Sequence, residues 1–164
     1  MDKIVKHGVV IADPVENMAS LIAAMVRGLG HRMVLEVTSA RELKTALASR
    51  SYSLIVMDDT MGPPDAVEMV RQMRTDYDNP NRTTAVIMMS SAPAIARIAE
   101  ARDAGVSEFL KKPFSAADLQ KRIAGLDINP REFIEAPAYS GPDRRRRKLT
   151  AGIDDQRGLK EPEA

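Results

Sequence analysis

Residues 53–57 read Ser-Leu-Ile-Val-Met and lead directly into the acidic pair Asp58 and Asp59. An aliphatic run this short, with no polar alternation, is typical of a strand that is buried on both faces of a sheet. Four more runs of this kind occur in the chain. They are GVVIA (8–12), MVLEV (33–37), AVIMM (85–89) and SEFL (107–110).

The segments between these runs place apolar residues at helical spacing. In the first segment the stripe consists of Met18, Leu21, Ile22, Met25, Val26 and Leu29. Ser39 and Glu42 form a capping box that opens a second helix, and Ser115 with Asp118 opens a fifth. The order is therefore a strand followed by a helix, five times over. It predicts an α/β fold, a doubly wound parallel sheet of five strands with two helices on one face and three on the other.

The alternating pattern stops after residue 126, which divides the chain into two parts. Residues 1–126 are expected to form the folded domain. Residues 127–164 contain several prolines and glycines and few large apolar residues, so we expect a flexible C-terminal tail.

The composition excludes several classes of protein. The 24 Lys and Arg residues nearly balance the 23 Asp and Glu residues, so no general attraction to nucleic acid is expected. The chain has no cysteine, which excludes disulfides, thiolate metal sites and cysteine nucleophiles. The sequence shows no secretory signal and no apolar run long enough to span a bilayer. We therefore expect a cytoplasmic protein.

Polar side chains follow four of the five predicted strands: Asp13, Asp58, Ser90 and Lys112. The carboxyl ends of parallel strands meet at one edge of a sheet, so these groups are expected to converge there. Two carboxylates are suited to Mg²⁺, and a lysine ammonium supplies a positive charge to a phosphoryl oxygen.

In order along the chain, these strand ends resemble the CheY-like receiver domain of two-component response regulators. The matching segments are IADP (11–14), VMDDTM (56–61), MMSS (88–91) and FLKKPF (109–114). The resemblance implies a flavodoxin-like fold with strand order 2-1-3-4-5, and a signalling protein rather than an enzyme, with no catalytic residues. It also implies that Asp58 accepts the phosphoryl group, that Asp13 and Asp58 hold Mg²⁺, and that Ser90, Phe109 and Lys112 form the switch.

One departure from the family pattern affects the metal site. The resemblance places a second acid after the first strand, where this chain has Pro14, which has no ligating side chain. Glu16 is the alternative ligand. We therefore expect weak Mg²⁺ binding and poor phosphorylation of Asp58, and the alternative is that Asp58 is a relic carboxylate paired with Lys112.

The segment YSGPDRRRRK (139–148) resembles the arginine-rich extension of the Cle group, CheY-like proteins of alphaproteobacteria that bind cyclic di-GMP. An arginine fork can pair with guanine O6 and N7 or with phosphate oxygens, and a carboxylate can accept from the opposite guanine edge. The residues implied in ligand binding are Tyr139, Asp143, Arg144, Arg145, Arg146, Arg147, Asp155 and Arg157.

Two functions follow. In the first, cyclic di-GMP orders the tail, and the complex acts by protein contact on the flagellar motor switch or on surface attachment. In the second, the chain is a conventional single-domain response regulator, phosphorylated on Asp58 by a histidine kinase, and the tail is a tether or basic patch. Either way, we expect the partner to bind around Phe109 and residues 93–125.

Overall fold

The computed structural model describes residues 8–128 and 132–145 of the chain. A five-stranded parallel sheet has the order β2-β1-β3-β4-β5, which confirms the predicted fold. The strands are β1 (Val9–Ala12), β2 (Val34–Val37), β3 (Leu54–Asp58), β4 (Ala85–Ser90) and β5 (Glu108–Lys111). The helices are α1 (Glu16–Gly28), α2 (Ala40–Ser49), α3 (Ala66–Thr75), α4 (Ile95–Ala104) and α5 (Ala116–Ile128).

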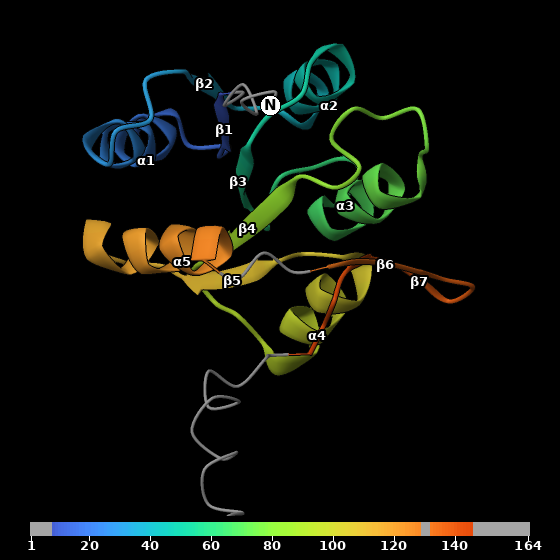
Figure 1. The fold of residues 1–164 in the computed structure, drawn as a ribbon. Helices are drawn as coiled ribbons and strands as arrows, with labels where there is room; N and C mark the ends of the chain where they lie inside the picture. Colours follow the sequence, from blue (N-terminus) through green and yellow to red (C-terminus); the bar gives the residue numbers. More distant parts are fainter. Residues whose placement is uncertain (1–7, 129–131, 146–164) are drawn as a thin grey trace, which may run out of the picture.

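The helices cover the sheet in two layers, two on one face and three on the other, as expected. Figure 1 shows α1 and α5 on one side of the sheet and α2, α3 and α4 on the other. Alternate residues of β1 point into different layers: Val9 and Ile11 pack with α1 and α5, and Val10 and Ala12 pack with α2 and α3. The central strands are therefore apolar on both faces, as the unbroken aliphatic runs predicted.

Local capping fixes where α2 and α3 begin. The Ser39 hydroxyl accepts from the Glu42 amide, as the capping box predicted. The Asp65 carboxylate accepts from the amides of Val67 and Glu68 and so caps α3, which begins after the turn that follows β3. A cap of this kind stabilises a helix by about 1 kcal/mol.

Residues 133–142 differ from the flexible tail that their composition indicated. They form an antiparallel hairpin of β6 (Phe133–Ala136) and β7 (Tyr139–Pro142), which lies beside α4 in Figure 1. The helix α5 also continues past residue 126, although the division of the chain there stays a prediction.

The buried Arg74 and the partly buried Arg82 hold this hairpin. The guanidinium groups of Arg74 and Arg82 both lie over the Phe133 ring, at 5.8 and 4.9 Å, and Arg82 pairs with Glu135 at 2.5 Å. Arg74 is fully buried and donates to the carbonyls of Gly105 and Arg82. Burial lowers the pKa of Arg74 to about 10. Because these contacts join residues far apart in sequence, composition alone did not reveal them.

Within the described residues, no helix combines the length and the apolar character needed to cross a membrane.

Candidate functional site

The structure brings three of the four predicted strand-end residues into direct contact. The Lys112 ammonium donates to Asp13 Oδ2 at 2.5 Å and to Asp58 Oδ2 at 2.6 Å. The aspartate side chains are 1% and 5% exposed, and that of Lys112 is 10% exposed. Two buried carboxylates thus share one buried ammonium, the arrangement expected of an ion-paired strand-end cluster.

The other oxygen of Asp58 is held by Thr60, a residue that the sequence reading did not single out. Asp58 Oδ1 accepts from the Thr60 amide at 2.9 Å and from the Thr60 hydroxyl. Burial acts to raise the pKa of Asp58, but the hydrogen bonds from Lys112 and Thr60 outweigh burial and lower it. Burial likewise acts to lower the pKa of Lys112, and its bonds to Asp13 and Asp58 raise it overall.

The side chains of Ser90 and Phe109 make contacts outside this cluster, although the Ser90 carbonyl accepts from the Lys112 amide at 2.8 Å. Ser90 ends β4, is 2% exposed, and its hydroxyl oxygen accepts from the Ala92 amide at 3.3 Å. Phe109 lies in β5, partly buried against the apolar core shared with α2, α3 and α4. Their predicted switch roles stay predictions.

The donor set of the cluster does not fit a strong Mg²⁺ site. Mg²⁺ requires about six oxygen ligands, and the cluster offers two carboxylates with a lysine ammonium between them. Pro14 and Glu16 are exposed, and Asp13 Oδ1 accepts from the Val15 amide. Among the residues that the structure describes, no group of three or more His, Cys, Asp and Glu side chains is placed to hold a metal.

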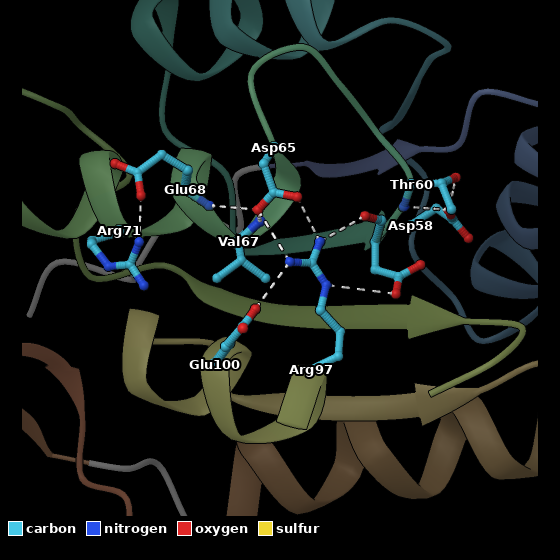
Figure 2. Close-up of polar contacts among 9 residues, drawn as sticks. Asp58, Thr60, Asp65, Val67, Glu68, Arg71, Arg97 and Glu100 are labelled. Atoms are coloured by element: carbon cyan, nitrogen blue, oxygen red, sulfur yellow. Dashed lines mark hydrogen bonds and ion pairs between the residues drawn. The ribbon is translucent and has the colours of Figure 1, made fainter. Parts of the chain in front are cut away.

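An arginine on α4 ties that helix to the loop after Asp58, as Figure 2 shows. Arg97 pairs with Asp65 at 2.8 Å, donates to the Asp59 carbonyl at 3.0 Å and contacts Glu100 at 3.4 Å. The hydrogen bond from Arg97 is the main cause that lowers the pKa of Asp65. This network could not be predicted from the sequence, because Arg97 and Asp65 are 32 residues apart.

Near the other end of α4, the segment after the hairpin places Arg144, the first of the four consecutive arginines, beside the domain. Arg144 donates to Asp103 Oδ1 at 2.8 Å, and its guanidinium lies 4.5 Å from the centre of the Tyr139 ring. Tyr139 in turn donates from its hydroxyl to the Pro142 carbonyl at 2.6 Å, and Asp143 accepts from the Arg145 amide. The structure therefore brings Tyr139 and Arg144 together and adds Asp103, which the sequence reading missed. Four predicted ligand residues lie outside the described residues: Arg146, Arg147, Asp155 and Arg157.

A model of the response regulator receiver domain family matches residues 9–124. Among known relatives, the sensory/regulatory protein RpfC of Xanthomonas campestris pv. campestris is 28% identical over 123 residues, which make up 75% of this chain and 17% of RpfC. The chain thus spans less than a fifth of that relative. The chemotaxis protein CheY-3 of Vibrio cholerae is 24% identical over 115 residues, 70% of this chain and 87% of CheY-3.

Solved structures agree on the fold. The chemotaxis protein CheY4 of Vibrio cholerae superposes with a TM-score of 0.65 at 18% identity, covering 73% of this chain and 98% of CheY4. The receiver domain of the Francisella response regulator 1452 gives a TM-score of 0.64 at 24% identity, covering 73% of this chain and 95% of that domain. The hairpin of β6 and β7 lies beyond the residues that the family model matches.

Proposed function

Because the chain belongs to the response regulator receiver domain family, we propose that it is a CheY-like signalling protein controlled by cyclic di-GMP. The nucleotide binds residues 139–157, with the consecutive arginines Arg144 to Arg147 as the main contacts. The bound protein then acts by contact with a protein partner, for which we propose a component of the flagellar motor.

One observation carries this proposal. Arg144 is placed with its guanidinium against Tyr139 and paired with Asp103, at the point where the arginine-rich segment leaves the hairpin. The Arg144 and Asp103 side chains are 47% and 50% exposed, so a ligand can reach them. An arginine plane and a carboxylate are the groups that guanine recognition uses.

The strand-end cluster of Asp13, Asp58 and Lys112 is a second, separate support for this proposal. Lys112 pairs with both Asp13 and Asp58 and so occupies an oxygen of each, and Pro14 offers no further ligand. A site arranged in this way is poorly suited to holding Mg²⁺, on which phosphoryl transfer relies to offset charge. We therefore propose that Asp58 accepts phosphoryl groups weakly.

The second candidate function is that of a conventional response regulator phosphorylated on Asp58 by a histidine kinase. The observation that favours it is the convergence of Asp13, Asp58 and Lys112 in one buried cluster. In that case the arginine-rich segment is only a tether or basic patch.

The proposed partner surface is α4, β5 and α5. Ile95, at the start of α4, is 89% exposed, and Ile98 one turn later is 38% exposed. Arg97, between them, links this helix to the loop after Asp58. Crosslinking that placed the partner wholly on α2 and α3 would refute this surface.

Calorimetric titration of the full chain with cyclic di-GMP tests the proposed function. Replacing Arg145, Arg146 and Arg147 by Lys keeps the charge but removes the planar forks, so we expect binding to weaken at least tenfold. In the control variant, Arg32 and Arg41, two exposed residues far in sequence from the arginine-rich segment, are replaced by Ala. This variant should bind cyclic di-GMP as the wild type does. Equal binding by the Lys variant would show a generic basic segment instead.

A further inference from the structure

The pair of Asp103 and Arg144 offers an ordered row of hydrogen-bonding groups on the surface of the domain. Arg144 contributes donors, and Asp103 contributes acceptors immediately beside them, 2.8 Å away. Among the described residues, the contacts of Asp103 with Arg144 and with Arg102, at 2.8 and 3.6 Å, both use Oδ1. Oδ2 is therefore a further acceptor on the same edge.

This row matches the edge of one purine and not the other. Guanine presents an acceptor at O6 next to donors at N1 and N2. The O6 acceptor would face an Arg144 donor, and the N1 and N2 donors would face the two carboxylate oxygens of Asp103. Adenine presents a donor at N6 next to an acceptor at N1, the reverse order. A buried or stacked mismatch of this type leaves polar groups unpaired, which is costly.

The charge of Asp103 decides which part of a nucleotide binds there. A phosphate on Arg144 would lie beside the Asp103 carboxylate and compete with it for the Arg144 guanidinium, a repulsion that Arg102, 3.6 Å from the same carboxylate oxygen, offsets only in part. The same carboxylate accepts from a neutral base edge at no such cost. Position 144 is therefore suited to the base of a cyclic dinucleotide, and the phosphates are left to other arginines.

The hairpin holds the pair in place before any ligand arrives. Gly141 packs so closely on Gly105 that a Cβ at position 141 would lie 2.9 Å from the Gly105 Cα. The Arg82–Glu135 ion pair and the stacking on Phe133 fix the other strand. The Arg144 guanidinium lies over the Tyr139 ring, 4.5 Å from its centre. Such preorganisation reduces the ordering cost of binding.

From these contacts we infer that Asp103, on α4, is the residue that selects guanine, and that it reads the base together with Arg144. The inference rests on the proposed binding of cyclic di-GMP. It adds that the receiver domain itself supplies one residue of the binding site. Asp103 lies on α4, outside the arginine-rich segment, and contacts that segment through its ion pair with Arg144.

The test compares the affinities of the full chain for cyclic di-GMP and cyclic di-AMP by calorimetry. We expect Asp103→Ala to lower the preference for cyclic di-GMP on the order of 10- to 100-fold, with binding of cyclic di-AMP unchanged or improved. Asp103→Glu, which keeps the carboxylate, should retain part of the preference. Asp78→Ala, which removes an exposed carboxylate elsewhere, should change neither affinity.

The ratio of the two affinities separates selection from structural damage. If Asp103→Ala merely undocked the hairpin, both affinities would fall together and the ratio would stay constant, which overturns the inference. A wild-type chain that binds cyclic di-GMP with no preference over cyclic di-AMP also overturns the inference while leaving the proposed function standing. A wild-type chain that binds neither nucleotide overturns the proposed function itself.

Discussion

Asp58 and Lys112 stabilise each other through opposite changes in their pKa values. The folded state lowers the pKa of Asp58 below 3.8 and raises that of Lys112 above 10.5. The contribution of Asp58 is thus present above its unfolded pKa and is lost as the pH falls through its folded pKa. The contribution of Lys112 is present below its unfolded pKa and is lost as the pH rises through its folded pKa. The cluster therefore stabilises the fold most between these limits.

Asp58→Asn should flatten the acid side of the stability profile. As the pH falls from about 5 to 2, the unfolded wild-type chain binds a proton at Asp58 before the folded chain does, so the free energy of unfolding decreases. The variant lacks this linkage, while Asp65 and the other carboxylates remain common to both proteins. Urea denaturation at several pH values measures the difference. Parallel profiles would contradict the assigned change in pKa.

Pro14→Asp should strengthen the metal site. Pro14 is exposed and adjacent to Asp13, so an aspartate there adds an oxygen donor beside a carboxylate already in the cluster. We expect tighter Mg²⁺ binding and faster labelling of Asp58 by acetyl phosphate. Full labelling of the wild type, with no change in Pro14→Asp, would show that Pro14 does not weaken Mg²⁺ binding or phosphorylation of Asp58.

At the scale of elements, Asp65 both caps α3 and binds Arg97 of α4. Asp65→Ala removes both contacts, and we expect the free energy of unfolding to fall by about 1–2 kcal/mol. Asp65→Asn can still cap the helix but loses the charge pair with Arg97, so it should cost less. Chemical denaturation of the two variants gives both values. Equal losses would mean that the pair with Arg97, and not the cap, carries the effect.

The docking of the hairpin depends on the absence of a side chain at residue 141. In Gly141→Ala, the Cβ would lie 2.9 Å from the backbone Cα of Gly105, so we expect the hairpin to leave the domain while the sheet stays folded. Gly28→Ala is the matched control, because a Cβ there meets nothing within 4 Å. Hydrogen exchange should speed up in β6 and β7 of the first variant only. Unchanged protection of these amides in Gly141→Ala would contradict the close packing.

These elements also show what the sequence could predict. The aliphatic runs and helical stripes were sufficient for the sheet, and parallel strands necessarily bring Asp13, Asp58 and Lys112 to one edge. The hairpin was missed because its strands have four residues each and are held mainly by Arg74 and Arg82 from elsewhere in the chain. Asp103 was missed for the same reason, because it is 41 residues away from Arg144.

Across the whole molecule, α4 connects two sites at opposite ends of the sheet. Near its start Arg97 binds the loop after Asp58, and near its end Asp103 binds Arg144 on the segment after the hairpin. Lys112 follows β5, at the carboxyl edge of the sheet, whereas Gly105, on which the hairpin packs, precedes β5. A ligand bound beside Asp103, as we propose, would therefore contact the same helix that Arg97 links to the loop after Asp58.

We propose that the signal enters through the arginine-rich segment and not through Asp58. Calorimetric titration of the full chain with cyclic di-GMP, repeated on Asp58→Asn and on a variant with Arg146 and Arg147 replaced by Ala, tests it most directly. We expect equal dissociation constants for the wild type and Asp58→Asn, and at least tenfold weaker binding by the arginine variant. No binding by the wild type, or unchanged binding by the arginine variant, would contradict it.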